Sequence, residues 1–229
     1  MRQVILDTET TGLNFKEGHR VIEIGCVEMI NRRLTGRNFH YYVNPEREVE
    51  KGALEVHGIN NDFLQDKPFF IDIAKEFCDF IEGAEMIAHN ASFDEGFLNH
   101  ELKLTKLDLG RVADYCKVFD TLVLARQLHP GQRNSLDALC KRYEITHFNR
   151  NLHGALLDAE ILAQVYLAMT GGQTTLFSEE SQYIATHDGA KQTKQRESKI
   201  LPLQIIYADN EELTTHEKML RLLNTTPDD

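Results

Sequence analysis

Two acids placed two residues apart follow the first apolar run of the chain. Val4–Leu6 is short and rich in β-branched residues, which predicts a buried strand that leads into a loop over residues 7–12. Asp7 and Glu9 stand at the end of this strand, where period-two alternation points both side chains to one face of a sheet. Like charges beside an apolar strand are costly unless a cation lies between them. Taken alone, the pair would more simply be an N-cap residue and an exposed turn acid.

A third acid opens a predicted helix. The segment HNASFD follows the short apolar strand Met86–Ala88, ends at Asp94, and places that residue in the first turn of a helix over residues 91–102. The helix macrodipole favours acids at helix N-termini, so an ordinary structural role explains Asp94 equally well when it is taken by itself.

The fourth acid lies among apolar residues of the last predicted helix, residues 155–169. Asp158 stands on or beside the stripe that faces the core, with no Lys or Arg within one turn, so its carboxylate needs a partner. His153 precedes this helix, and a continuous helix would separate it from Asp158 by about 140°. We therefore place His153 in the preceding loop, held by Gly154. Alone, it would be a surface histidine at a helix entry.

Together these residues suggest phosphodiester chemistry. Four carboxylates, at about −4, balance two divalent cations, which is the charge arithmetic of a two-metal phosphodiesterase site. Ligand sets made only of oxygen favour Mg²⁺ or Mn²⁺ over zinc. A neutral histidine near such a site is a natural acceptor for the proton of the attacking water.

The elements that must position these residues form a mixed α/β pattern. The strand at residue 4 and two strand candidates at residues 20–30 and 34–43 predict an antiparallel meander. Strands and helices then alternate, which predicts crossovers and a mixed sheet with helices on its faces. The further helices are expected from Pro68 to residue 81 and over 121–128 and 136–143, the last capped by Ser135, with a strand over 117–119.

Composition limits the class of protein. The 229 residues include 25 Lys plus Arg against 36 Asp plus Glu, a formal net charge of −11, which argues against a protein that coats nucleic acid. The four Cys form no CxxC pair, so neither a disulfide framework nor a zinc site is expected. An acid at position 7 interrupts any apolar core of a signal peptide. The sequence contains no run of about 18 apolar residues, the length needed to span a membrane. We expect a soluble, cytoplasmic protein.

The composition changes after Gly171. Residues 182–199 are rich in Gln, Thr, Lys and Ser, which predicts a flexible linker, and apolar residues return from Ile200 onward. We therefore divide the chain into a catalytic domain over residues 1–170 and a tail over residues 171–229.

Three motifs resemble those of a known enzyme family. DTETTGL, HNASFD and HGALLDAE, in this order and spacing, are similar to the three motifs of the DEDDh family of 3′→5′ exonucleases. The resemblance implies a ribonuclease H-like, five-stranded mixed sheet, metal ligation by Asp7, Glu9, Asp94 and Asp158, and His153 as general base. It implies two divalent cations as cofactors and the 3′ end of DNA as substrate.

The same resemblance assigns contacts with the substrate. Besides Asp7, Glu9 and Asp158, it implies contacts of the terminal nucleotide with Thr10, Gly12, Gly52, His57 and Phe93. Each has a structural alternative: an ordinary turn for Thr10 and Gly12, a helix-end residue for His57, and a core aromatic for Phe93. Relatives often carry an acid at the place of Gly52, where this chain offers only backbone.

Further segments, among them RRLTG, RNSLDALC and the stretch from His153 to Thr174, resemble the proofreading branch of the family. This resemblance implies removal of mispaired 3′-terminal nucleotides as a subunit of a bacterial replicase. It implies that Gln173, Leu176 and Phe177 bind the sliding clamp and that residues 199–224 dock on the catalytic subunit of the polymerase. A small accessory subunit often binds the exonuclease domain of such proteins. The alternative for the end of the tail is a helix that folds back on its own domain.

Two other functions fit part of the sequence. A ribonuclease of the same family would share the four acids but would need neither a clamp motif nor a docking tail. An adaptor subunit without catalysis would not need the complete set of acids with His153.

Overall fold

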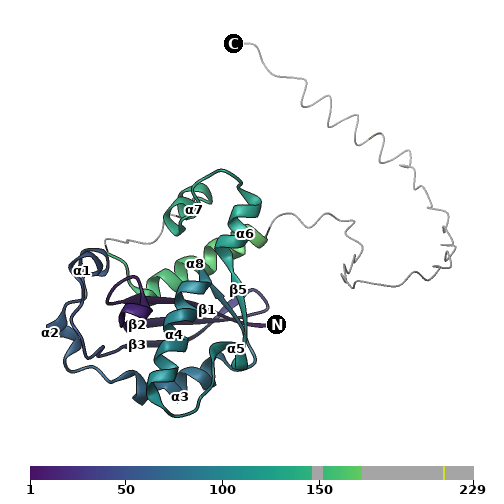
Figure 1. Cartoon of the computed structure of the whole chain (residues 1–229). Coiled ribbons are helices and arrows are strands. Elements are labelled where there is room, and N and C mark those ends of the chain that lie inside the picture. The colour runs from purple at the N-terminus through teal and green to yellow at the C-terminus, as the bar shows by residue number, and fades with distance from the viewer. Residues whose placement is uncertain (146–151, 172–213, 215–229) are drawn as a thin grey trace, which may run out of the picture. The chain divides into compact units, whose positions relative to one another are not determined.

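A computed structural model describes residues 1–145, 152–171 and 214 of the chain. Its centre is a five-stranded sheet in the order β3-β2-β1-β4-β5. The strands are β1 (Arg2–Thr10), β2 (Val21–Ile30), β3 (Arg33–Tyr42), β4 (Glu85–Ala88) and β5 (Lys117–Asp120). The first three pair antiparallel, and β4 and β5 run parallel to β1, which confirms the predicted mixed sheet (Figure 1).

The predicted hairpin forms between β2 and β3. Ile30 pairs with Arg33, so Asn31 and Arg32 form a two-residue turn, and both have positive φ, at 49° and 65°. Positive φ at both central residues is the mark of a type I′ turn, whose twist matches that of the flanking strands. The turn chemistry therefore sets the register of this hairpin.

Eight α-helices connect or follow the strands of the sheet in the described part of the chain. They are α1 (Lys51–His57), α2 (Asn61–Leu64), α3 (Phe70–Ile81), α4 (Ala91–Thr105), α5 (Val112–Tyr115), α6 (Thr121–Leu128), α7 (Leu136–Arg142) and α8 (Ala155–Thr170), with a 3₁₀ helix over Phe15–Glu17. The helices predicted from Pro68 to residue 81 and over 91–102, 121–128, 136–143 and 155–169 form as α3, α4, α6, α7 and α8. Ser135 caps α7 through a bond from Ala138 N–H to Ser135 Oγ of 3.4 Å. The sequence predicts no helix at α2 or α5 and indicates α1 only through His57 as a possible helix end, because elements of four to seven residues show little helical periodicity. Helix α7 is as short as α1 but was predicted with Ser135 as its cap.

Alternation along β1 separates two cores on opposite faces of the sheet. Leu6 belongs to a cluster with Phe77 of α3 and Phe97 of α4. Ile5 belongs to a second cluster with Leu162 of α8. Helices α3 and α4 therefore cover one face and α8 the other (Figure 1).

One boundary differs from the prediction in a way that matters for the site. The loop expected after Leu6 is wrong, because β1 continues to Thr10. Asp7 pairs with Gly25 and Glu9 with Glu23, and the register shifts only between Glu9 and Thr10. Ladder pairing with β2 outweighs the polar character of this segment, so Asp7 and Glu9 are held by a strand.

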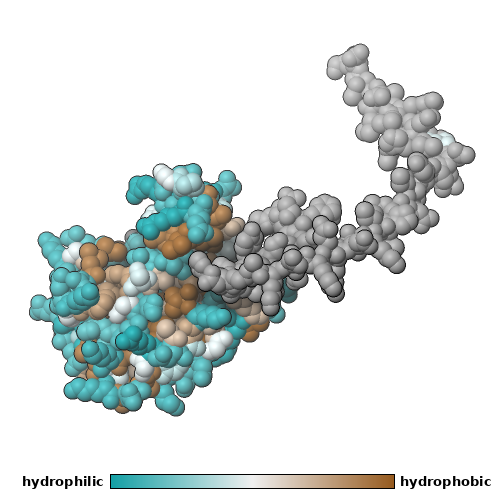
Figure 2. Space-filling model, turned by 45° about the vertical axis from the view of Figure 1, so that its right-hand side comes forward, coloured by the Kyte–Doolittle hydropathy of each residue, from teal (hydrophilic) through white to brown (hydrophobic). Residues whose placement is uncertain are grey.

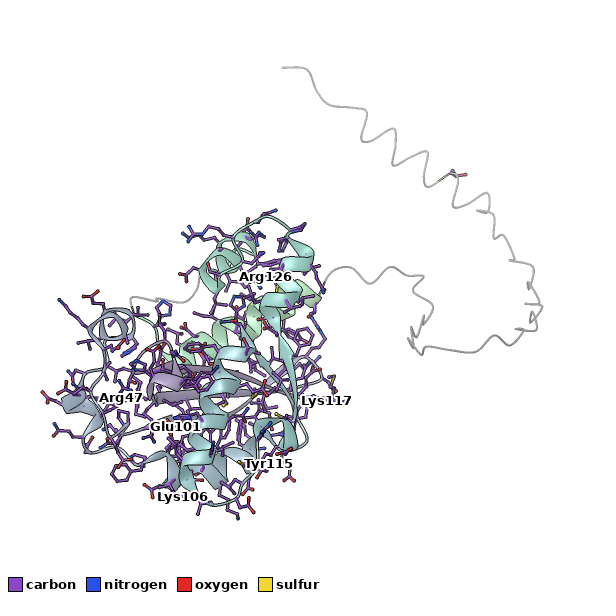
Figure 3. The ribbon with its side chains drawn as sticks, in the orientation of Figure 1. Arg47, Glu101, Lys106, Tyr115, Lys117 and Arg126 are labelled. Carbon is purple, nitrogen blue, oxygen red and sulfur yellow. The ribbon has the colours of Figure 1, made fainter. Side chains whose placement is uncertain are left out.

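A buried ion pair ties α4 to β2. Glu101 is 1% exposed and accepts two bonds from Arg20, from Nε and Nη2, each at 2.8 Å, and a third from Val21 N–H at 3.0 Å. This pairing raises the pKa of Arg20 above its ordinary value. Figure 3 marks Glu101 near the middle of the folded unit and Lys106 and Lys117 at its outer edge. Both carboxylate oxygens of Glu101 accept bonds, which is the condition for a buried charge to be tolerated.

Within the described ranges, no helix is both long and apolar enough to cross a membrane. Hydrophilic residues cover most of the face in Figure 2, with smaller hydrophobic areas between them. The expected clamp motif, linker and docking segment lie outside the described residues, except for Thr214 of the docking segment.

Candidate active site

Glu9, His153 and Asp158 form a cluster at the end of β1. One ligand atom from each lies within 4.8 Å of the other two, the only such set of His, Cys, Asp or Glu among the described residues. His153 Nδ1 lies 3.2 Å from Asp158 Oδ2. His153 precedes the first residue of α8, in the loop where the sequence predicts it, and its side chain is 41% exposed while that of Asp158 is 3% exposed.

A glycine in β2 lets α8 approach the sheet at this point. A Cβ added to Gly25 would lie 2.2 Å from both the carbonyl carbon of Ala155 and the amide nitrogen of Leu156. Gly25 is the strand partner of Asp7, so the first turn of α8 lies directly beside that acid. Asp158 follows in the same turn and faces Glu9. The bare backbone of Gly25 thus sets how closely the two sets of acids meet, a role that sequence analysis missed.

Asp94 reaches β1 from the other face of the sheet. Its Oδ1 accepts a bond from Thr8 Oγ1 at 2.7 Å, and Thr8 alternates with Asp7 and Glu9 along the strand. Asp94 is 3% exposed, and burial raises its pKa from 3.8 to about 7. The structure therefore groups Glu9 and Asp158 with His153, places Asp7 beside them on the same face, and holds Asp94 behind Thr8.

Asp120, which sequence analysis missed, fixes the start of α4. Its carboxylate accepts bonds from the N–H groups of Asn90 at 3.2 Å and Ala91 at 3.1 Å, and from Leu122 at 2.8 Å. One side chain therefore caps α4 and α6 together. Its negative charge also contributes to the raised pKa of Asp94. The available signal was an acid between a short strand and a helix.

A cavity of about 360 Å³ lies next to the cluster, and Glu9 is part of its wall. Apart from the acids, the resemblance implies five residues that contact the substrate. All five line this cavity: Thr10, Gly12, Gly52, His57 and Phe93. Glu50, Leu13 and Val56 also line it and were not anticipated. Segments that are distant in sequence thus meet around one space of nucleotide size.

The walls of this cavity are internally braced. Thr10 Oγ1 donates to the carbonyl of Gly12 at 2.7 Å. His57 is the last residue of α1 and is 5% exposed. Its Nδ1 accepts a bond from Ile59 N–H at 3.0 Å, and burial lowers the pKa of its imidazole. Phe93 packs against Phe97 with ring centroids 4.9 Å apart, so it is at once a core aromatic and part of the wall. Around Gly52 nothing lies within 4 Å of an added Cβ.

The donor set suits hard divalent cations. Asp7, Glu9, Asp94 and Asp158 offer only carboxylate oxygens, the ligands that Mg²⁺ and Mn²⁺ prefer. Bringing Asp94 into its charged form costs free energy in the protein alone, as its raised pKa indicates. A nearby cation would repay this cost, so the acids fit such ions.

Comparison with known proteins decides the family. A model of the exonuclease family (RNase_T) matches residues 4–166. The chain is 52% identical to the DNA polymerase III subunit epsilon of Salmonella typhimurium and 51% identical to that of Escherichia coli, over 97% of this chain and 93% of each relative. The chain belongs to the exonuclease family, among the DNA polymerase III epsilon subunits. It is therefore an exonuclease.

Solved structures agree with the assignment to the exonuclease family. Exonuclease X, solved in complex with 5′ overhanging duplex DNA, is 28% identical with a TM-score of 0.58, over 75% of this chain and 92% of that chain. Exonuclease I of E. coli, solved with single-stranded DNA, has a TM-score of 0.63 at 16% identity, over 75% and 41% of the two chains. The latter likeness concerns the fold, which is ribonuclease H-like as the motifs imply.

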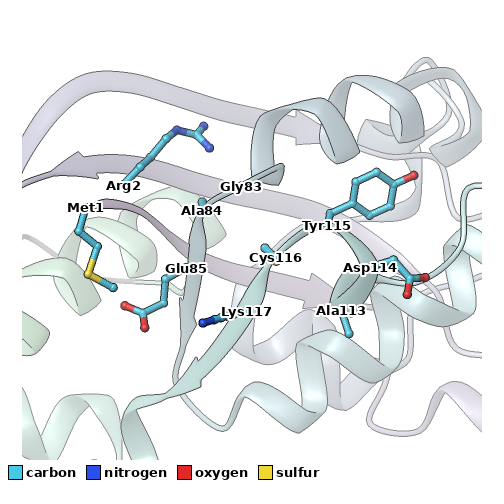
Figure 4. Close-up of a pocket in the computed structure, with 10 residues that line it drawn as sticks. All are labelled: Met1, Arg2, Gly83, Ala84, Glu85, Ala113, Asp114, Tyr115, Cys116 and Lys117. Atoms are coloured by element: carbon cyan, nitrogen blue, oxygen red, sulfur yellow. The ribbon is translucent and has the colours of Figure 1, made fainter. Parts of the chain in front are cut away.

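A second cavity, of about 580 Å³, lies at the opposite ends of the parallel strands (Figure 4). Its wall mixes charges of both signs, from Arg2, Glu85, Asp114 and Lys117. Within the described ranges it holds no group of metal-ligating atoms. The group of possible metal-ligating atoms that the described residues do contain lies at the carboxyl end of β1.

Proposed function

We propose that this chain is the proofreading subunit of a bacterial DNA polymerase III, and that it removes mispaired 3′-terminal deoxynucleotides as mononucleotides. The relatives named as epsilon subunits cover nearly its whole length. The observation that carries the chemistry is the cluster of Glu9, His153 and Asp158 beside a cavity that Glu9 also lines.

Asp7, Glu9, Asp94 and Asp158 would hold two divalent cations, Mg²⁺ or Mn²⁺. Such cations, when bound, activate water and stabilise the charge that develops on the phosphate. The chain itself supplies the negative charges and fixes their positions. Glu9 and Asp158 stand on β1 and α8, and Asp94 on α4, so three rigid elements deliver the carboxylates.

His153 would act as the general base. It accepts the proton of the attacking water, the water oxygen forms a bond to phosphorus, and the bond from phosphorus to the 3′-oxygen of the penultimate nucleotide breaks. The leaving 3′-oxygen takes up a proton from solvent, so the shortened strand ends in a 3′-hydroxyl, and the terminal nucleotide leaves as a 5′-monophosphate. The contact from Nδ1 to Asp158 orients the imidazole for this transfer.

The cavity would hold the terminal nucleotide. Thr10, Gly12 and His57 contribute to its walls, with Phe93 available to a sugar or base. A single nucleotide with a free 3′ end fits a space of about 360 Å³. This placement explains an exonuclease that starts at strand ends.

We also propose the partners and domain division that the sequence suggests. Residues 1–170 form the catalytic domain, residues 173–177 bind the sliding clamp, and the end of the tail docks on the polymerase catalytic subunit in the cytoplasm. A small accessory subunit on the catalytic domain is part of this proposal.

The proposal is tested by removing the first two acids. We expect Asp7→Ala with Glu9→Ala to lower the Mg²⁺-dependent degradation of a primer with a mismatched 3′ end by more than about 10³-fold, the scale of losing electrostatic stabilisation. Circular dichroism and the melting temperature should stay those of a folded protein. The exposed acid Glu48 provides a matched control, and Glu48→Ala should retain full activity. Undiminished cleavage in the double variant would contradict the proposal.

A further inference from the structure

His19 is buried beside the proposed nucleotide cavity but does not line it. It is 3% exposed. Nδ1 lies 3.0 Å from Thr11 Oγ1, and Nε2 lies 3.2 Å from Glu50 Oε1. One ring thus joins the end of the β1 segment to the residue that precedes α1.

The neighbouring bonds determine which nitrogen carries the proton. Glu50 offers a carboxylate oxygen, which only accepts, so Nε2 must donate to it. In a neutral imidazole Nδ1 is then an acceptor, and the hydroxyl of Thr11 donates to it. That hydroxyl is itself held, because Arg20 N–H donates to Thr11 Oγ1 at 3.0 Å. A directed chain of bonds therefore runs from Arg20 through Thr11 and His19 to Glu50.

The same ring supports Gly12 from behind. A Cβ added to Gly12 would lie between 2.4 and 2.7 Å from three atoms of the His19 ring, so the glycine backbone rests directly on it. Gly12 also receives the Thr10 hydroxyl on its carbonyl. The backbone of the segment Thr10–Gly12 is thus positioned by the histidine on one side and faces the cavity with the other.

Glu50 closes the arrangement from the side of α1. Its N–H donates to the carbonyl of Thr11 at 3.0 Å, and it precedes α1, which carries Gly52 and His57. Both Glu50 and Gly12 line the cavity. Two links therefore fasten one wall to the other: a backbone bond and the side chain of His19.

We propose that His19 is a positioning residue that sets the distance between the segment Thr10–Gly12 and the start of α1, and so the fit of the terminal nucleotide. This inference rests on the proposed function. His19 does not contact Glu9, Asp158 or His153 in any bond described above, so its loss should weaken substrate binding more than the chemical step.

The test compares KM and kcat on a single-stranded DNA oligonucleotide, together with inhibition by thymidine 5′-monophosphate. For His19→Leu we expect KM and the inhibition constant to rise about tenfold, with kcat within about twofold, as for loss of uniform binding. His19→Gln should recover part of the loss, because its amide N–H can still donate to Glu50. Glu48→Ala is the exposed control.

Glu50→Ala removes the partner without emptying a buried site, since the Glu50 side chain is 58% exposed. We expect it to raise KM, and we expect the double variant with His19→Leu to be no worse than His19→Leu alone. Unchanged KM and inhibition in a folded His19→Leu protein, a kcat loss that dominates, or additive effects in the double variant would overturn the inference. A wild-type chain without Mg²⁺-dependent activity would instead refute the proposed function, and the nucleotide inhibition test would then be replaced by direct titration of the nucleotide.

Discussion

At the scale of single residues, burial decides how the acids of the site behave. Glu9 and Asp158 lie close to an imidazole, whereas Asp94 has Thr8 as its hydrogen-bonding neighbour and is removed from water. The cost of charging Asp94 is visible in its pKa of about 7. In the proposed function a bound cation would stabilise the charged form of this buried carboxylate. Without the cation, the cost of charging Asp94 should be measurable in the protein alone, without substrate.

We expect Asp94→Asn to stabilise the metal-free protein increasingly as pH rises from about 4 to about 7. In this window the folded protein keeps a proton on Asp94 that the unfolded chain releases, so wild-type stability falls with rising pH, by up to about 4 kcal/mol for a shift of about three units. The amide has no such penalty and can still accept from Thr8. Thermal unfolding in EDTA at pH 5 and pH 8 measures the difference, and parallel pH profiles of the two proteins would argue against it.

His153 carries a second prediction at this scale. Removing a general base costs about 10²- to 10⁴-fold in rate, so we expect His153→Ala to lower kcat by that amount with a small change in KM. The side chain is 41% exposed, so the melting temperature should change little. Single-turnover cleavage of a DNA oligonucleotide measures the effect. A rate equal to wild type would remove His153 from the proton transfer.

At the scale of elements, the site depends on how α8 meets the sheet. Helix α8 delivers Asp158 and follows His153, and its first turn lies against the bare backbone of Gly25. His153 N–H also donates to the carbonyl of Val56 at 3.2 Å, which ties the start of α8 to α1. The positions of these helices, more than any single bond, set the distances in the cluster.

Gly25→Ala should therefore reduce activity through α8. The added methyl would lie 2.2 Å from the helix backbone, so α8 must move or the strand must bend, at a cost of about 1–3 kcal/mol. We expect a lower melting temperature and a marked fall in kcat. Gly154→Ala is the matched control, because nothing lies within 4 Å of a Cβ there. Equal melting temperatures for the two variants would show that the close approach is not needed.

At the scale of the whole molecule, the formal net charge of −11 affects the binding of both cations and DNA. Four of the acids would hold cations in the proposed function, and acidic residues outnumber basic ones 36 to 25, so binding to free DNA should be weak and sensitive to salt. An enzyme of this kind would depend on its partners to remain at a primer end. The catalytic domain and the tail should then be separable.

Truncation after Gly171 tests this separation. We expect the shortened chain to keep its Mg²⁺-dependent nuclease activity within about twofold, because the residues of the site precede the cut, and to lose association with clamp and polymerase. Nuclease assays and pull-down with purified clamp and catalytic subunit measure the two properties. Retained association would place the docking surfaces in residues 1–171 instead.

The sequence by itself determined the local features of this protein. Short apolar runs predicted the five strands, helical periodicity and a cap predicted helices such as α3 and α7, and three short motifs located the acids and His153. These features depend on neighbours along the chain, so they can be predicted from the sequence alone. Short helices such as α2 and α5 cannot be predicted in this way, because four residues carry too little periodicity.

Only the tertiary structure decided which of these residues meet. It extended β1 to Thr10, put Asp158 and His153 with Glu9 on one face, and left Asp94 behind Thr8 on the other. It also brought His19 and Glu50 to the back of the Thr10–Gly12 segment. The reason is physical: sheet pairing and helix packing join residues that are far apart in sequence, and spacing along the chain does not encode those distances.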